Sequence, residues 1–281
     1  MLNPTAIRTG AVYGSLLLMV GVMLPFLPVW LAAKGFSIAE VAFALACQSV
    51  VRVVATPVIA YMADLYRARR RFIVSLAFLS AGFMLMAALV DSKPAIIALI
   101  VLSAATWAPI MPMLDAVAVE QSEEGYYDYG RVRIAGSVTF ITGSLGAGAL
   151  LSVIDKTGLI WVLVATHVLL AVSGIALPRL GAARAVQSQP LTLGDARKVL
   201  LTGSFALLIL VAGLTQASHA GYYGVGSLHW ATLGSSGVTI GALWSVGVIA
   251  EIFRFMYARG SVERLGPVLL LMAGGFFGAL R

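Results

Sequence analysis

Opposite charges lie inside stretches of the chain that are otherwise apolar, and their spacing suggests how they could hold a small polar molecule. Asp115 lies five residues before Glu120, and Arg133 lies five residues after Asp128. At a helical rise of about 1.5 Å per residue, each would lie about 7.5 Å into its helix from the connecting loop. Ionised groups in hydrocarbon persist where they face a partner or a water-filled cavity. We therefore expect Asp115 and Arg133 to interact.

Other functions for these arginines stay open at this point. Arg131 is expected to be an interfacial anchor whose guanidinium extends to the membrane surface. Arg133 could do the same, or it could form a purely structural ion pair between two helices.

Two further charges could act on a substrate and on a proton. Arg52 lies twelve residues before Asp64, about 18 Å along a helix and too deep to reach the surface easily. We expect it to face a cavity. Glu251 lies eight residues before Arg259, about 12 Å in, and a carboxyl away from water suits a proton carrier. Arg254 shares its helix face and could instead pair with it.

The elements that must position these charges are membrane helices. Hydrophobic residues make up 60% of the chain and charged residues 11%, and the mean hydropathy is +0.96. These values exclude a water-soluble domain. The fold class is therefore predicted to be all-α, a polytopic membrane helical bundle. Stretches of about 20 residues, long enough to cross hydrocarbon, are expected near residues 9–32, 38–63, 72–90, 95–119, 132–154, 158–178, 199–224 and 237–258.

A ninth stretch begins near Pro267 and stops at Arg281. Fifteen residues of helix rise about 22 Å, too little to finish a crossing. We expect the chain to be truncated within this span.

Basic residues alternate between the two sets of span ends. One set holds only lysines, namely Lys34, Lys93 and Lys156. The other set is rich in arginine and includes Arg8, Arg67, Arg69, Arg70, Arg71, Arg131, Arg133, Arg179, Arg184, Arg197, Arg259 and Arg264. By the positive-inside rule, the arginine-rich side and the N-terminus are cytoplasmic in a cell (inner) membrane. The net charge of +7 thus indicates topology, and nucleic acid is not an expected partner.

One composition shift divides the chain. Residues 179–198 are polar, basic and small, and they are predicted to be a cytoplasmic linker between an N-terminal six-helix half, 1–178, and an incomplete C-terminal half, 199–281. The two halves match best at an offset of 199 residues. The matched positions are Gly35 with Gly234, Ser37 with Ser236, Arg52 with Glu251, and Asp64 with Glu263.

Several segments are typical of a known transporter family. They are "AYMADLYRARRR" at 60–71, "PMLDAVAVE" at 112–120, "YGRVRIAGSV" at 129–138 and "GALR" at 278–281. In these segments the chain resembles the major facilitator superfamily, and within it the proton symporters of the lactose permease and 3-phenylpropionate permease type. The resemblance implies two six-helix halves with a substrate site near the midplane.

The resemblance also implies roles for single residues. Asp115 and Arg133 fall on the carboxylate and arginine that hold substrate in lactose permease. Phe140 takes the aromatic stacking position, where an indole would favour a galactosyl ring, so a galactoside is not the expected substrate. Arg281 matches an arginine of the proton site.

A cytoplasmic gate is implied in the loop that follows the second span. Its members are Asp64, Arg67, Arg70 and Arg71. A solvated cluster of loop charges is the alternative.

Histidines, aromatic residues and glycines in the spans are expected to pack. His167 and His219 are interpreted as packing histidines, and Tyr222, Tyr223 and Trp230 as an interfacial belt. The glycine-rich run 143–148 is expected to allow close helix contact.

The predicted function is secondary transport of a small organic solute, by proton-coupled symport and alternating access. Arg52 and Arg133 favour an aromatic or other carboxylate. Sugar or nucleoside symport is the alternative, as is a non-transporting scaffold or receptor. The chain has no GxSxG or HExxH motif, so no enzyme activity or cofactor is expected. A single cysteine, Cys47, excludes an internal disulfide and a multi-cysteine metal site. The expected partners are substrate, protons and the lipid bilayer, and the full-length protein is expected to be a monomer.

Overall fold

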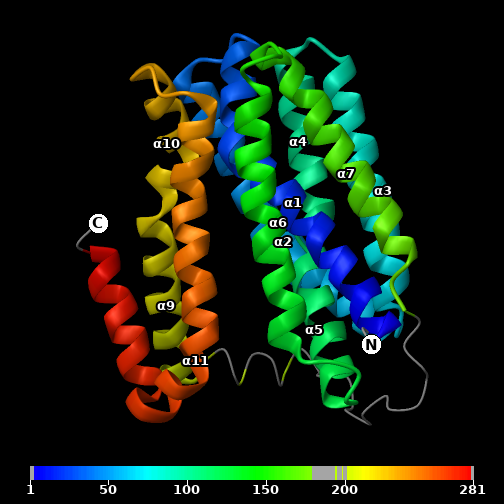
Figure 1. The fold of residues 1–281 in the computed structure, drawn as a ribbon, viewed down its shortest axis with the longest axis vertical. Helices are drawn as coiled ribbons and strands as arrows, with labels where there is room; N and C mark the ends of the chain where they lie inside the picture. Colours follow the sequence, from blue (N-terminus) through cyan, green and yellow to red (C-terminus); the bar gives the residue numbers. More distant parts are fainter. Residues whose placement is uncertain (1–2, 179–193, 195–197, 199–200, 280–281) are drawn as a thin grey trace.

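The computed structural model describes residues 3–178, 194, 198 and 201–279, and within 251–279 only some of the side chains. Every regular element in these residues is helical (Figure 1). The predicted linker, 179–198, lies almost entirely outside the described residues. Its role between two halves stays a prediction.

The helical crossings run alternately up and down the molecule, and α4 with α5 and α9 with α10 each form one crossing (Figure 1). Those before the linker are α1 (Pro4–Ala33), α2 (Ile38–Leu65), α3 (Arg69–Leu89), α4 (Lys93–Trp107), α5 (Ile110–Glu123), α6 (Tyr129–Leu150), the 3₁₀ turn η1 (Lys156–Gly158) and α7 (Leu159–Ile175). Those after it are α9 (Gly203–Ser218), α10 (Ala220–Thr232) and α11 (Gly237–Ala279). Among the described residues, six helical stretches are long and apolar enough to cross a membrane. The fold is therefore that of a multi-pass membrane protein, as predicted.

Two of these crossings are broken into separate helices. The stretch Lys93–Glu123 is divided into α4 and α5 at Ala108 and Pro109, because a proline inside a helix removes a backbone donor. The stretch Gly203–Thr232 is divided into α9 and α10 at His219. Gly266 interrupts α11 with φ 73°, next to the predicted start of the ninth span.

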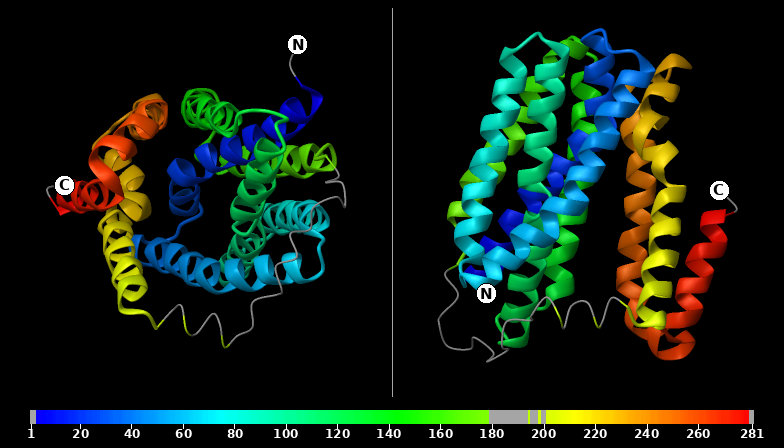
Figure 2. Two further views of the ribbon diagram at one scale, coloured as in Figure 1. Left: turned by 90° about the horizontal axis from the view of Figure 1, so that it is seen from below. Right: turned by 180° about the vertical axis from the view of Figure 1, so that it is seen from behind.

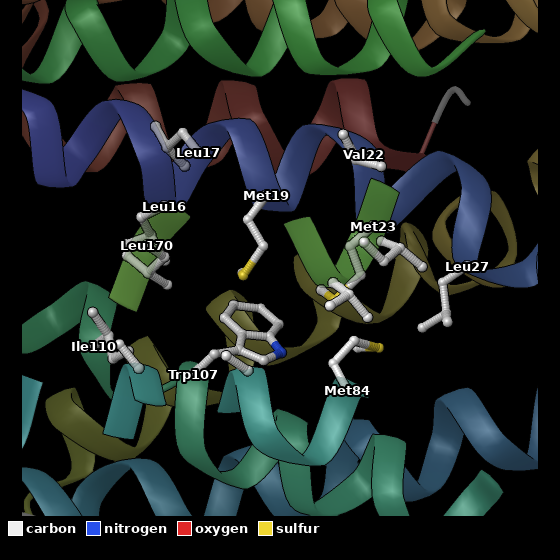
Figure 3. Packing of buried hydrophobic residues seen from close by; sticks show 14 of the residues in the cluster. Leu16, Leu17, Met19, Val22, Met23, Leu27, Met84, Trp107, Ile110 and Leu170 are labelled. Carbon is white, nitrogen blue, oxygen red and sulfur yellow. The ribbon is translucent and has the colours of Figure 1, made fainter. Parts of the chain in front are cut away.

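Helix α1 forms the centre of the set of helices before the linker. In its most apolar window, 72% of the residues are buried, compared with 17% for α2. Figure 3 shows α1 side chains, including Met19 and Met23, facing Met84, Trp107 and Leu170 from three other helices. Apolar packing thus fixes the helices that carry the polar groups described below.

Helix α6 runs between α1 and α11, and glycines allow both contacts (Figure 2, left). A Cβ atom at Gly143 would lie 2.6 Å from the carbonyl oxygen of Leu18 on α1. A Cβ atom at Gly148 would overlap the carbonyl oxygen of Gly237 on α11. The expectation that the run 143–148 permits close helix contact is confirmed.

Turns related by the offset of 199 residues share a positive φ angle. Gly35 and Gly234, which each precede a helix, have φ values of 82° and 81°. Arg67 and Gly266 have φ values of 49° and 73°. Among the described residues only Gly125 also has a positive φ, so these two pairs support the internal repeat at the level of the backbone.

Candidate functional site

Asp115 joins three helices of the bundle. Pro109 begins the α5 helix, and Asp115 lies in its second turn. Its Oδ1 accepts a hydrogen bond of 2.5 Å from the Tyr13 hydroxyl on α1 and one of 3.0 Å from the Tyr129 hydroxyl on α6. Sequence reasoning missed both tyrosines.

Arg133 reaches the same cluster from α6. The helix begins at Tyr129 because the Asp128 side chain accepts a hydrogen bond of 3.0 Å from the Arg131 backbone N–H. Two residues, about half a helical turn, separate exposed Arg131 from half-buried Arg133. The Arg133 guanidinium carbon lies 6.0 Å from the centre of the Tyr13 ring. Tyr13 therefore contacts both predicted members of the pair, and their direct interaction stays a prediction.

A second polar cluster lies nearer the arginine-rich end of the bundle. Gln121 Oε1 accepts hydrogen bonds from the Thr9 hydroxyl at 2.8 Å and the Tyr127 hydroxyl at 2.6 Å. Burial raises the pKa of Tyr127, which lies between α5 and α6. Together with the Asp115 cluster, these bonds tie the first turns of α1 to α5 and to the start of α6.

Arg52 lies on the inner side of α2. Its Nε donates to the Gln48 carbonyl at 3.3 Å, and an Nη donates to the Ser49 hydroxyl at 3.1 Å. The guanidinium carbon is 5.7 Å from the ring centre of Trp107, at the end of α4. Met19, near the middle of α1, points toward that ring (Figure 3). Among the side chains that the structure describes, no carboxylate lies within 4.0 Å of Arg52.

The loop after α2 holds an ion-pair cluster at the arginine-rich end. Arg69, which belongs to the same run of basic residues, bonds Asp64 and lies 3.7 Å from the carboxylate of Glu120 on α5. Arg67 forms the left-handed turn between α2 and α3, and Arg71 is exposed at the start of α3. Asp64 thus forms an ion pair with Arg69, within the N-terminal set of helices.

Arg70 binds the end of another helix. It donates to the carbonyls of Ile175 at 2.7 Å and Leu177 at 2.6 Å, at the end of α7. A gating role for this loop stays a prediction.

Phe140 lies apart from these clusters. Phe140 is buried, with 6% of its surface exposed, where the α6 backbone meets Gly21 of α1. The side chain of Glu251 and all of Arg281 lie outside the described residues. Their roles stay predictions.

Aromatic residues of α10 and α11 form a cluster. The rings of Tyr222 and Tyr223 lie 4.8 Å and 5.4 Å from that of Trp244. Trp244 donates to the Ser227 hydroxyl at 2.8 Å. These tyrosines follow directly after the break at His219, within a 30-residue crossing, so they pack well inside the span, whereas Trp230 near its end fits an interfacial belt.

A pocket of about 270 Å³ lies at the other end of the bundle, between the N-terminal set of helices and α10. Its lining is mostly apolar: Ala32, Phe36, Ile38, Val41, Val225, Leu228, His229 and Thr232. Lys34 bonds Asp91 at 2.8 Å nearby and lowers the pKa of that exposed carboxyl. The described side chains include no group of three or more His, Cys, Asp or Glu placed to hold a metal ion.

Comparison with known proteins decides the family. The model described as "MFS_1 like family" matches residues 12–281. The chain belongs to the MFS_1 like family. The predicted resemblance to the major facilitator superfamily is confirmed.

Curated relatives in this comparison have the names of transporters and not of enzymes. The "Probable 3-phenylpropionic acid transporter" of Escherichia coli (strain K12) is 29% identical over 175 residues, 62% of this chain and 46% of that protein. Maltose permease of Geobacillus stearothermophilus is 26% identical over 268 residues, 93% of this chain and 66% of that protein. The chain therefore spans less than two thirds of the length of either relative.

Solved structures show the same fold. Two crystal structures of the nucleoside transporter NupG match 93% of this chain with TM-scores of 0.78 and 0.73, at 15% and 17% identity. The matches cover 69% and 68% of those chains. At this identity the likeness concerns the arrangement of the helices.

Proposed function

We propose that the protein belongs to a secondary transporter that moves a small organic anion, with an aromatic carboxylate favoured, by proton-coupled symport and alternating access. Arg52 is the observation that carries the proposal. Its guanidinium is half-buried in a membrane helix, it faces Trp107, and no described carboxylate neutralises it.

The surroundings of Arg52 suit a ligand with a carboxylate and an aromatic ring. A cation inside a membrane helix costs at least about 2.5 kcal/mol, so it is retained where it binds a partner or marks a substrate path. An arginine binds a carboxylate through parallel N–H donors. Trp107 gives the same guanidinium an aromatic, apolar neighbour, and an apolar ring of the substrate would pack beside this pair. One relative has a name that specifies 3-phenylpropionic acid, which carries both groups.

The other predicted residues take their roles within this proposal. Asp115 and Arg133 bind polar groups of the substrate, and Phe140 contributes an apolar wall. Glu251 and Arg281 exchange the coupling proton. The loop from Asp64 to Arg71 forms the cytoplasmic gate.

Sugar or nucleoside symport is a second candidate. Asp115 is surrounded by tyrosine hydroxyls, and a carboxylate in such a setting suits the hydroxyl groups of a sugar or ribose. A relative named maltose permease and the structural match to a nucleoside transporter are consistent with this candidate.

Binding and uptake measurements distinguish the candidates. For the chain in lipid nanodiscs, we expect 3-phenylpropionate to bind, and Arg52→Gln to weaken its binding by at least about tenfold, or about 1.4 kcal/mol. Arg131→Gln, which removes an exposed arginine on α6, is the control and should leave binding unchanged. Uptake into proteoliposomes by the full-length protein should require an inward proton gradient.

The opposite pattern would reject the anion proposal. Binding of uridine or maltose that is independent of Arg52 would favour the second candidate. Acid binding that survives Arg52→Gln unchanged would remove Arg52 from the site.

A further inference from the structure

Gln48 is a buried donor next to the half-buried cation of α2. Its side chain is 4% exposed, and its Nε2 has no hydrogen-bond partner. Arg52 follows four residues later, so both side chains leave the same face of the helix, one turn apart. The Arg52 Nε donates to the backbone carbonyl of Gln48, which holds the guanidinium over this turn of the helix.

Other buried polar groups without a partner differ from Gln48. Gln121 and His167 each use their second polar side-chain atom, which bonds Thr9 and Tyr127 or the Leu163 carbonyl. Trp30 has one polar atom and is fully buried on α1. The Gln48 Nε2 has no hydrogen-bond partner among the described residues, and it is the donor that lies one turn from a cation.

The position of Gln48 on the helix directs it toward the interior of the molecule. Ile38 and Val41, on the same stripe of α2, line the pocket against α10. Residues on the other side of α2, such as Val50 and Val53, are 66% and 75% exposed. Because positions 41, 45, 48 and 52 repeat at helical spacing, Gln48 lies between that pocket and Arg52.

We propose that Gln48 is a second ligand for the anionic group bound at Arg52, so that one turn of α2 supplies donors to both oxygens of a single carboxylate. Native proteins leave few buried amides without a hydrogen bond. A carboxylate bound at Arg52 would supply the hydrogen-bond acceptor that the Gln48 Nε2 lacks among the described residues. This inference rests on the proposed anion transport and adds a residue that determines specificity.

Substitution of Gln48 by Met tests the inference, because Met has nearly the same length and no donor. For the chain in nanodiscs, we expect Gln48→Met to weaken 3-phenylpropionate binding by about tenfold, the equivalent of about 1.4 kcal/mol. Without ligand, its Tm should equal or exceed that of the unsubstituted chain, because a vacant buried amide has been removed.

Gln121→Met is the matched control. That glutamine is also buried with a free Nε2, but its Oε1 accepts two hydrogen bonds. Its substitution should lower the Tm and leave the Kd for 3-phenylpropionate unchanged. A Gln48→Met chain with lower Tm and unchanged Kd would show that Gln48 is structural and would overturn the inference.

If the Gln48→Met chain does not fold, a second variant tests the inference. Gln48→Glu places a carboxylate one turn from Arg52, where it would occupy the guanidinium. We expect this chain to fold and to lose 3-phenylpropionate binding, and normal binding would overturn the inference.

Arg52→Gln separates this inference from the proposed function. If Arg52→Gln weakens binding and both Gln48 variants do not, the proposed function stands and the role of Gln48 is rejected. If the unsubstituted chain binds no aromatic acid, both are rejected.

Discussion

Two tyrosine hydroxyls share one carboxylate oxygen at Asp115. Such bonds satisfy a charge inside the helical bundle and fix the distance between α1, α5 and α6. The same Tyr13 ring lies beside the Arg133 guanidinium. Tyr13 therefore holds both charges in place, and its removal should affect them together.

Tyr13→Phe tests this arrangement. It removes one hydroxyl from Asp115 and keeps the ring beside Arg133. We expect unfolding in detergent to become easier by about 1–2 kcal/mol, above the roughly 0.6 kcal/mol average for bonds between membrane helices because Asp115 is charged. In a double-mutant cycle with Asp115→Asn, the two effects should not add.

Tyr127→Phe is the control for this cycle, since that hydroxyl bonds Gln121 and not Asp115. Its effect should add to that of Asp115→Asn. Additive effects of Tyr13→Phe and Asp115→Asn would contradict the shared role.

At the scale of single residues, the charged side chains of the site could be predicted from the sequence, whereas the residues that contact them could not. The depth of Asp115, Arg52 and Arg133 follows from counting residues along a helix. The partner of Asp115 on α1 does not, because Tyr13 lies 102 residues earlier and a tyrosine can either pack in a core or lie at a membrane interface. The same applies to Glu120, whose contact with Arg69 depends on the packing of α3 against α5.

The contact between α6 and α11 depends on small residues at the level of whole helices. Gly148 and Gly237 bring the two backbones together, and Ser144 donates to the carbonyl of Gly241 at 3.1 Å. Contacts of this kind are typical of membrane helices, where close backbone approach takes the place of hydrophobic burial.

Gly148→Ala should disturb this contact. A methyl group there would overlap the Gly237 carbonyl, and such overpacking costs about 1–3 kcal/mol. Gly146→Ala is the control on the same helix, because its Cβ would have no neighbour within 4 Å and Ala is the better helix former. Thermal unfolding should show a lower Tm for the first variant and an equal or higher Tm for the second.

The helices themselves could largely be predicted from apolar length. The predicted fourth span, 95–119, corresponds to α4 and α5 with a break at Pro109, and the predicted seventh span, 199–224, corresponds to α9 with only the first turns of α10. The end of α10 was missed because apolar length does not show a break such as the one at His219, after which the helix resumes. The tyrosines that follow the break were interpreted as an interfacial belt for the same reason.

The arrangement across the membrane is a property of the whole molecule. The arginine-rich end holds the turn at Arg67, and the other end holds Lys34 and Lys93. With Cys47 replaced by alanine, single cysteines at Ser188 and Lys93 should react with an impermeant thiol reagent from opposite sides of the membrane. The positive-inside rule places Ser188 in the cytoplasm. Labelling of both positions from one side would reject this topology.

The turns that share a positive φ bear on how the chain arose. Gly35 and Gly234, and Arg67 and Gly266, each keep a positive φ at one offset, while Arg52 and Glu251 at that same offset have opposite charges. A duplicated ancestral unit would leave this record, in which turns are inherited and side chains diverge. The turns are then the better anchor for aligning the two halves of a distant relative. Because matched positions in the two halves need not carry the same charge, each half can take a different part in transport while the helices keep the same arrangement.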